Sequence, residues 1–512
     1  MKASIRHRLL TAKRRIARRL QPRQWANQPR PMFTAQNIQY EIAERTQGVA
    51  SGGIGAMHLL ARRIGLIETI DRHLHLLKQH KPYHESDHVL NIAYNLLCGG
   101  ARLEHLELRR NDEVYAKALG AQRIPDPTTA GDFCRRFSML DVLKLMQIFN
   151  RVRQGVWRQQ PPSFFDHAVI DADGTLAPTS GECKQGMDIG YDGQWGYQVL
   201  LLSLANTGEP LYFLNRSGNR PSHEGAATFF DLAIMLCRES GFRKITIRGD
   251  TDFSQTKYLD GWHDDKVRFI FGFDANETLK AELETLPENA WKPLVRPRKH
   301  TAKTVPRQKP ENVKEQMVVE REFENKRLLR EEVAEFAYRP AACKHTYRMV
   351  ALRKHIRVTQ GQQWLFDTRT PFFYITNDRE APPEVIVVQE ANQRCNQENL
   401  IGQLKSGVRA LDMPVDNLLS NWAYVVMAAL AWSLKAWAAL LLPETGHAAE
   451  TRRHEKQRLL RMDFKTFLNA WMQLPCQILR AGGRLIYRFL SWNPWQPAFF
   501  RLLDQLRHPL RC

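Results

Sequence analysis

The sequence predicts a mixed α/β fold, with a sheet covered by helices, between helical regions at both ends of the chain. From Gly55 to about Val156 the apolar residues recur at helical spacing, and the final hundred residues are again helical and basic. Between these regions the β-type runs "HAVIDADGT", "YQVLLLSLA" and "PLYFLN" follow one another in hairpin order. Helix and strand patterns then alternate, which is typical of a mixed sheet with helices packed on it.

Length and charge limit the class of protein. The 512 residues are 43% hydrophobic, which is enough for one large core or two to three domains. The 74 Lys and Arg outnumber the 54 Asp and Glu, so the net charge is +20. That excess favours a polyanionic partner, nucleic acid first and an anionic membrane surface second. Residues 1–40 contain no acid, and we expect a basic arm that is solvated and poorly ordered or that lies along phosphates.

Cysteine usage indicates a reducing compartment, and hydropathy argues against a signal peptide and a membrane span. The eight cysteines are scattered, without a C-x-x-C pair or a His/Cys cluster at zinc spacing, which argues against a structural metal and a disulfide framework. No apolar stretch follows the basic N-terminus, so we predict no signal peptide. The stretch Trp422–Leu442 most resembles a membrane span, but Lys435 interrupts it before the ~18–20 apolar residues that a bilayer needs. A buried core helix is the better interpretation.

Basic residues gather in the helical region and in a later Pro-rich stretch. In the helical region, Thr128 or Thr129 can cap a helix that enters "AGDFCRRF". Arginines of this region either form a charged helix surface or contact DNA: Arg102, Arg109, Arg110, Arg135 and Arg136. The Pro-rich, basic stretch Trp291–Lys314 is predicted to be a disordered loop for most of its length.

Acidic residues stand where predicted strands end. In "VIDADGT", strand alternation places Asp171 and Asp173 on one face, and "ITIRGDTDF" ends its strand at Asp250, with Asp252 two residues further on. A strand end points its acid into the crevice above an open α/β sheet, where ligands usually bind. The alternative is that each Asp caps the turn or helix that follows.

The stretch "NQRCNQENLIGQLK" (392–405) places one acid between two cations. At ~100° per residue, Arg394, Glu398 and Lys405 share one face of a helix with positions 391 and 401. An exposed Arg–Glu pair adds only a few tenths of a kcal/mol, so stability is a weak reason for it. Three carboxylates could instead hold hard divalent cations such as Mg²⁺, which assist in-line phosphoryl transfer, while Arg394 and Lys405 hold DNA phosphates.

At these residues the sequence resembles the DDE transposases of bacterial insertion sequences, most closely the insertion sequence 1380 family within the larger insertion sequence 4 clan. The blocks "DADGTLAPTSGECKQGMDIGYDGQWGYQVLLLSLANTGEPLYFLNRSGNRPSHEGA" and "RGDTDFSQTKYLDGW" are similar to that family's first and second catalytic blocks. The stretch "NQRCNQENLIGQLK" resembles the third-block signature Tyr-x-x-Arg-x-x-x-Glu-x-x-x-x-x-x-Lys, except that Ala391 stands in place of Tyr. The resemblance covers roughly residues 50–440.

The resemblance implies a site and its cofactor. It places the catalytic, metal-binding acids at Asp173, Asp250 and Glu398, with Asp171 and Asp252 as rivals to their neighbours, and it makes Arg394 and Lys405 DNA-binding residues. Two Mg²⁺ ions, which Mn²⁺ can replace, would be the cofactors.

The resemblance also implies a ribonuclease-H-like fold with a β-rich insertion between the second Asp and the Glu. These two acids lie 148 residues apart (398 − 250), and in relatives an insertion-domain aromatic can stack on a flipped base, for which Trp364 is the candidate. A core position is the alternative for Trp364. We therefore expect six parts: a basic arm (1–40), a helical DNA-binding domain (41–160), a catalytic domain in two pieces (161–274 and 371–445), a β-rich insertion domain (275–370) and a basic helical C-terminal region (446–512).

The resulting hypothesis is a transposase that cuts at terminal inverted repeats and joins the freed 3′-hydroxyls to target DNA. Its partners would be double-stranded DNA at the element's ends and at the target, with no membrane, and it would act as a dimer or larger assembly. Its place would be the bacterial cytoplasm, at the nucleoid. The alternatives are an inactive, transposase-derived DNA-binding protein or repressor, and a nuclease that cuts without joining.

Overall fold

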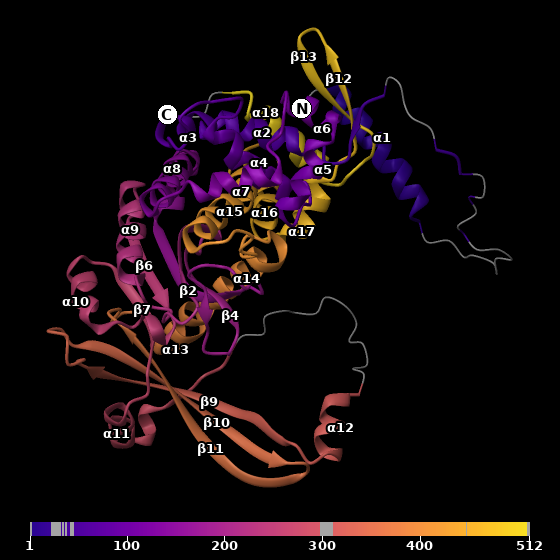
Figure 1. Ribbon diagram of the computed structural model, residues 1–512. Coiled ribbons are helices and arrows are strands. Elements are labelled where there is room, and N and C mark those ends of the chain that lie inside the picture. The colour runs from indigo at the N-terminus through magenta and orange to yellow at the C-terminus, as the bar shows by residue number, and fades with distance from the viewer. Residues whose placement is uncertain are drawn as a thin grey trace.

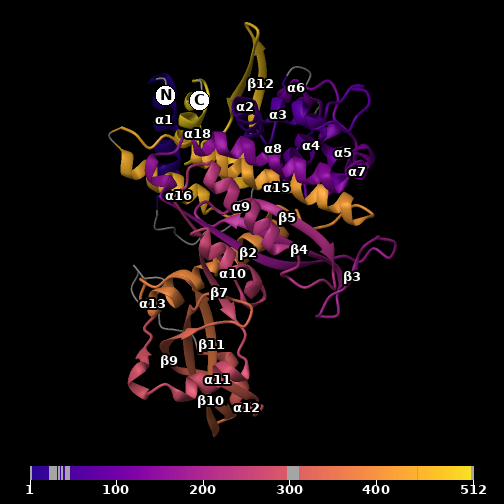
Figure 2. The ribbon, with the colours of Figure 1, turned by 90° about the vertical axis from the view of Figure 1, so that its left-hand side faces the viewer.

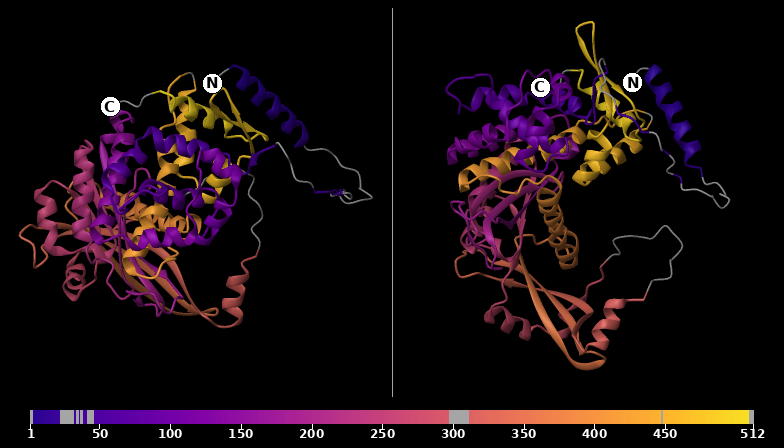
Figure 3. Two further views of the ribbon diagram at one scale, coloured as in Figure 1. Left: turned by 45° about the horizontal axis from the view of Figure 1, so that its top comes forward. Right: turned by 45° about the vertical axis from the view of Figure 1, so that its right-hand side comes forward.

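The computed structural model describes residues 3–21, 32, 35, 38–40, 46–296, 311–446 and 448–508. Helices from both ends of the chain form a thick layer on one side of a large mixed sheet, and a long arm of three strands projects from the other end of that sheet (Figure 1). Figure 3 shows in two further views that the arm stands apart from the helical layer. The mixed α/β prediction is confirmed.

The N-terminal part of the helical layer is built from short amphipathic helices whose apolar faces meet. They are α2 (Ile54–Arg63), α3 (Leu66–His73), α4 (Glu85–Leu97), α5 (Leu106–Arg110), α6 (Glu113–Leu119), α7 (Pro127–Arg135) and α8 (Met139–Trp157). The predicted threonine cap of α7 is wrong: Asp126 is the cap, and its carboxylate accepts the Thr129 N–H at 2.8 Å, which leaves Pro127 at the first helical position.

The sheet has ten strands, and its first half carries the acids. Its order is β3-β4-β2-β6-β7-β11-β10-β9-β8, with β5 also paired to β4. Strands β2, β6 and β7 are parallel, whereas the other pairings are antiparallel. The elements of this half are β2 (His167–Pro178), β3 (Asp188–Ile189), β4 (Trp195–Leu204), β5 (Glu209–Ser217), α9 (Ala226–Glu239), β6 (Lys244–Gly249), α10 (Thr256–Asp264) and β7 (Arg268–Phe273).

The arm continues the same sheet. It comprises α11 (Glu277–Thr285), β8 (Lys292–Pro293), α12 (Val313–Glu320), β9 (Glu324–Tyr338), β10 (Tyr347–Gln360) and β11 (Gln363–Thr376). Residues 373–376 of β11 pair with β7, so the boundary expected at residue 370 falls inside a strand. The part of the Pro-rich stretch from 297 to 310, predicted to be a disordered loop, lies outside the described residues.

Helix α15 (Leu418–Leu440) is the centre of the core. Among the described residues it is the one helix with the length and composition to cross a membrane, but its apolar window is entirely buried against α4, α7, α8 and β5. Lys435 is fully buried in it, donates a hydrogen bond to the Leu460 carbonyl at 2.9 Å and lies 3.6 Å from the centre of the Trp432 ring. Burial lowers its pKa to about 7. The prediction of a buried core helix is confirmed.

The two ends of the chain differ from expectation. The C-terminal region contains α16 (Ala449–Leu460), α17 (Phe464–Phe467) and α18 (Gln496–Gln505), but also a hairpin of β12 (Cys476–Ala481) and β13 (Arg484–Phe489), to which β1 (Gly48–Val49) adds. The purely helical prediction was wrong here because Gly482 and Gly483, both at positive φ, form the tight turn of a hairpin. Likewise, residues Ala3–Arg19 of the expected arm form α1, a basic helix beside α18.

Candidate active site

Two of the candidate acids lie side by side because of strand register. The parallel strands β2 and β6 pair Asp171 with Arg248, so Asp173 and Asp250, each two residues further on, reach the same carboxyl edge of the sheet. Asp173 lies within β2, whereas Asp250 follows β6 and accepts the backbone N–H of Asp252 at 3.1 Å. This edge is where open α/β sheets bind ligands.

The third acid is delivered by helix α14 (Cys395–Gly402), which is fixed to the sheet by its neighbour Gln397. The Gln397 side chain is 2% exposed and donates to the Leu201 carbonyl of β4 at 3.1 Å. Its amide oxygen also accepts a hydrogen bond from the Ser203 hydroxyl. Because Gln397 faces the sheet, the adjacent Glu398, with a side chain 60% exposed, faces the open edge.

Arg394 connects the acids. One guanidinium nitrogen lies 3.3 Å from an Asp173 oxygen, and another lies 3.6 Å from a Glu398 oxygen. The arginine side chain is 19% exposed, so the contact is partly shielded from water. Arg394 is therefore the counter-ion of the acidic group in the metal-free protein. Burial lowers the pKa of the Lys405 ammonium. The Asp173 carboxylate is close enough to oppose this shift, but its effect is smaller.

The electrostatics show that the three carboxylates converge. Burial raises the pKa of Asp173 to about 6; Arg394 opposes this shift, and the charges of Asp250 and Glu398 add to it. Burial likewise raises the pKa of Asp250, again against Arg394. A carboxylate whose pKa is raised by the charges of neighbouring carboxylates favours a shared cation, and carboxylate oxygens are the ligands that Mg²⁺ prefers. The donor set therefore fits a divalent metal.

The rival acid Asp171 has another task. It is 1% exposed, and both its oxygens bind the Arg248 guanidinium, at 2.7 and 2.8 Å. A third nitrogen of Arg248 donates to the Glu390 carbonyl at 2.7 Å. This buried ion pair ties β2 to β6 and to the segment before α14, so Asp171 has no free oxygen for a ligand. Asp252 contributes its backbone N–H to Asp250, and its carboxylate is a further charge that raises the pKa of Asp250.

The segment that carries Glu398 is not the regular helix expected. It runs from α13 (Pro383–Val385) through a π-helical turn (Ile386–Ala391), a 3₁₀ turn (Asn392–Arg394) and α14 into a second π-helical turn (Gln403–Gly407). The prediction that Arg394, Glu398 and Lys405 share one face of a regular helix, at ~100° per residue, is therefore wrong in detail. The π-helical and 3₁₀ turns change the rotation per residue along the segment. Arg394 and Glu398 still meet at Asp173, whereas Ala391 packs against a small apolar cluster that includes Ile386.

Three residues of the site were missed in the sequence. Gln397 and Arg248 position the acids, and neither has a local pattern that marks it. Asp274 follows β7 at the same edge of the sheet and adds to the raised pKa of Asp250. It has the same signal as the predicted acids, a strand that ends in Asp ("FIFGFD").

The other candidate residues lie away from the acids. Arg135 forms ion pairs with Asp132 and Asp416, at 2.8 and 3.0 Å, on a helix surface. Trp364 lies at the far end of β11, 60% exposed, with its indole N–H on Asp367 at 3.1 Å. Nine residues of strand, roughly 30 Å, separate it from Phe373, where β11 joins β7.

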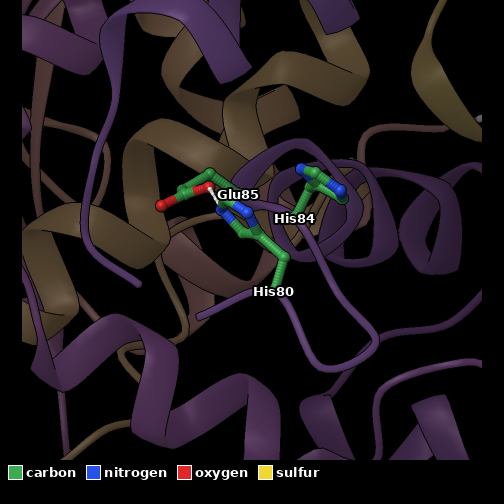
Figure 4. A group of neighbouring side chains, drawn as sticks. All are labelled: His80, His84 and Glu85. Carbon is green, nitrogen blue, oxygen red and sulfur yellow. Dashed lines mark hydrogen bonds and ion pairs between the residues drawn. The ribbon is translucent and has the colours of Figure 1, made fainter. Parts of the chain in front are cut away.

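A second group of ligand-type side chains lies at the start of α4 and in the loop before it (Figure 4). The ligand atoms of His80, His84 and Glu85 are all within 4.8 Å of one another. However, the Glu85 carboxylate already accepts N–H groups of Leu76 and Leu77, both at 2.9 Å, and a ring nitrogen of His80 lies 3.0 Å from it. The two imidazoles stack at 4.1 Å with an angle of 15°, so their in-plane lone pairs run side by side and do not converge. The group fits a clamp on the loop better than a metal centre.

Comparison with known proteins adds one assignment. A family model described as "Transposase DDE domain group 1" matches residues 38–509. No curated protein matches the sequence. A similar solved structure is the "Cryo-EM structure of piggyBac transposase synaptic complex with hairpin DNA", with 8% identity, 83% of each chain covered and a TM-score of 0.35.

Proposed function

Because the chain belongs to the DDE transposase family, we propose that it cuts DNA at the terminal inverted repeats of a bacterial insertion sequence and joins the freed 3′-hydroxyls to target DNA. The single observation that carries this proposal is the meeting of Asp173, Asp250 and Glu398 at one edge of the sheet, where Arg394 lies between Asp173 and Glu398. The insertion sequence 1380 family is the group within which we place it.

The arrangement of the first five strands supports a ribonuclease-H-like catalytic fold. Strands β5, β4 and β2 form an antiparallel meander, and β6 and β7 add in parallel on the other side of β2. The arm is inserted after β7, and the chain returns to the same edge as the segment that ends in α14. The three acids thus come from distant parts of the sequence but from adjacent structural elements.

The three acids would hold two Mg²⁺ ions, or Mn²⁺ in their place. When bound, such ions stabilise the charge on the attacking and leaving oxygens of a phosphoryl displacement. The protein's own part is to fix the acids, through Gln397 and the β2–β6 register, and to place two positively charged side chains beside them. Arg394 and Lys405 would bind the phosphates that flank the cut, which holds the strand in line for reaction.

The rest of the chain would supply DNA recognition. The helices from α2 to α8 and the basic helix α1 are proposed to bind the inverted repeats, because the chain's charge of +20 needs a polyanionic partner. Both ends of an element must be held together, so we propose a dimer or larger assembly on DNA. The protein would work at the nucleoid in the bacterial cytoplasm, with no part in a membrane.

The test is Mg²⁺-dependent cleavage of a duplex that carries an element end, followed by detection of joined products. Glu398→Gln should abolish both activities, whereas the neighbouring Asp252→Asn should retain most of them. Full activity of Glu398→Gln would refute the assignment of the acids. Cleavage without joining would indicate a nuclease, and DNA binding without cleavage under any divalent metal would indicate a repressor-like protein.

A further inference from the structure

A short turn beyond the end of β2, the strand that carries Asp173, presents aromatic side chains to solvent. We call residues 188–195, between the end of β2 and the start of β4, the β3 turn; it projects from the edge of the sheet (Figure 2). Tyr191 is 99% exposed, Trp195 52% and Ile189 45%. Large apolar side chains that face water without a partner mark contact sites when they are clustered.

The turn is well formed, so this exposure is not the result of an irregular chain. The Gly190 N–H donates to the Gln194 carbonyl at 2.8 Å, and the Gly193 N–H donates to the Gly190 carbonyl at 3.0 Å. The Asp192 carboxylate accepts the backbone N–H of Gln194 at 3.2 Å and its side-chain amide at 3.1 Å. Gly193 has φ +78°, which a residue with a side chain rarely adopts. Tyr191 is therefore held outward by a turn with its own hydrogen bonds.

The β3 turn folds back toward the acids. A Cβ placed on Gly190 would lie 3.3 Å from a methyl carbon of Leu176, three residues beyond Asp173 on β2. Burial lowers the pKa of Lys405, and the Asp192 carboxylate is near enough to oppose this shift. The Thr179 N–H donates to the Trp195 carbonyl at 2.9 Å, which places Trp195 six strand residues, roughly 20 Å, beyond Asp173.

We propose that Tyr191 and Trp195 stack on unpaired nucleobases of the DNA strand that enters the acidic site. The proposal rests on the proposed function only in taking DNA as the ligand. Aromatic side chains bind base faces without sequence preference, and a base face is available only where the base is unpaired. Arg394 and Lys405, which lie at the acids, would hold the phosphates of the same strand further along its path. Trp364, in contrast, lies at the distant end of the arm.

The experiment measures DNA binding of the full chain in EDTA, so that no strand is cut. The probes are a duplex with a short single-stranded tail that carries 2-aminopurine, and the same sequence fully paired. We expect wild-type protein to prefer the tailed duplex and to quench the 2-aminopurine fluorescence. In Tyr191→Ala/Trp195→Ala the preference should fall roughly 5- to 150-fold, as expected for the loss of one stacked base. Tyr191→Phe/Trp195→Phe should retain it.

Phe323→Ala is the matched control, since it removes an aromatic of the same chain that is 52% exposed and has no proposed part in binding, and it should leave the preference unchanged. Thermal melting of each variant checks folding. An unchanged preference in the double alanine variant, or an equal loss in Phe323→Ala, would overturn the proposal. So would a change in oligomeric state without DNA, which would identify a second copy of the chain as the partner. A protein that binds but never cuts would refute the proposed function while this result still stood.

Discussion

Replacing Asp173 by Asn should stabilise the metal-free protein. The carboxylate is 13% exposed in its side chain and faces Asp250 and Glu398, so its ionised form is disfavoured and its pKa is raised to about 6 from 3.8. The amide of Asn has nearly the same shape but carries no charge. The substitution therefore removes a buried charge, and with it the smaller repulsion from Asp250 and Glu398, without leaving a cavity.

The raised pKa sets the size of the effect. The shift from 3.8 to about 6 corresponds to about 3 kcal/mol, at ~1.4 kcal/mol per pKa unit, and the attraction to Arg394 is already contained in it. Because the folded protein binds this proton more tightly than the unfolded chain, stability falls as the pH rises from about 4 to about 6. The cost is complete above pH ~6, so Asp173→Asn should gain about 3 kcal/mol at neutral pH and nothing near pH 4.

The assay is urea unfolding in EDTA across this pH range, with Asp171→Asn as the matched variant. Asp171 lies two residues away on the same face of β2, but it is paired with Arg248 at 2.7 and 2.8 Å. Burial raises the pKa of Asp171 as well, although Arg248 opposes the shift. The loss of the ion pair decides the outcome, because removing one partner of a buried pair typically costs ~3–5 kcal/mol by leaving the other charge uncompensated. The two substitutions should therefore change the free energy of unfolding in opposite directions.

Two results would refute this reasoning. One is a loss of stability in Asp173→Asn at neutral pH as large as that in Asp171→Asn. The other is a gain that does not depend on pH between about 4 and 8, since a pH-independent gain cannot come from the titration of this group. Excess Mg²⁺ should raise the melting temperature of the wild type and have little effect on Asp173→Asn.

Three further outcomes are expected. Gln397→Leu should cost ~1–3 kcal/mol in urea unfolding, because its hydrogen-bond partners stay buried, and should reduce cleavage well below the melting temperature, because Glu398 loses its anchor. Lys435 has a pKa of about 7, so above pH ~7 the unfolded chain binds a proton that the folded protein lacks. The free energy of unfolding should therefore rise toward pH ~10 by up to ~1.4 kcal/mol per pH unit. Lys435→Met should abolish this slope. Glu209→Gln, which leaves Arg153 buried without a countercharge, should cost ~3–5 kcal/mol by urea unfolding with unchanged DNA affinity per folded molecule.

The acids at strand ends could be found in the sequence because the signal is local. A β-type run that ends in Asp describes Asp250, which follows β6, whereas Asp173 lies within β2, which continues to Pro178. The register of β2 and β6 brings the two acids to the same edge. The mixed sheet and the buried helix α15 were predictable for the same reason, since each depends on the spacing of neighbouring residues. Asp274 carries the same local signal, because it follows the last residue of β7 at this edge.

Features that depend on contacts between residues far apart in the sequence could not be predicted from such local patterns. The arm joins the catalytic sheet through only four residue pairs between β7 and β11, about a hundred residues apart in sequence. No local pattern distinguishes that pairing from a separate domain that begins and ends nearby. The π-helical turns on either side of α14 are a similar case: Gln397 holds the helix by hydrogen bonds to β4, and such tertiary contacts decide where the turns of the segment widen.

The choice between Asp171 and Asp173 shows what sequence alternation cannot decide. Both side chains leave the same face of β2, so the spacing gives them equal standing. The difference comes from the neighbouring strand: β6 places Arg248 directly opposite Asp171, whereas opposite Asp173 the strand has ended. Asp171 is therefore neutralised by a partner built into the sheet, and Asp173 is left to repel Asp250. An acid that is paired within the sheet, such as Asp171, supplies stability, whereas Asp173 shares Arg394 with Glu398 and is proposed to hold a cation. Opposite responses to the same Asp→Asn change are therefore the decisive measurement.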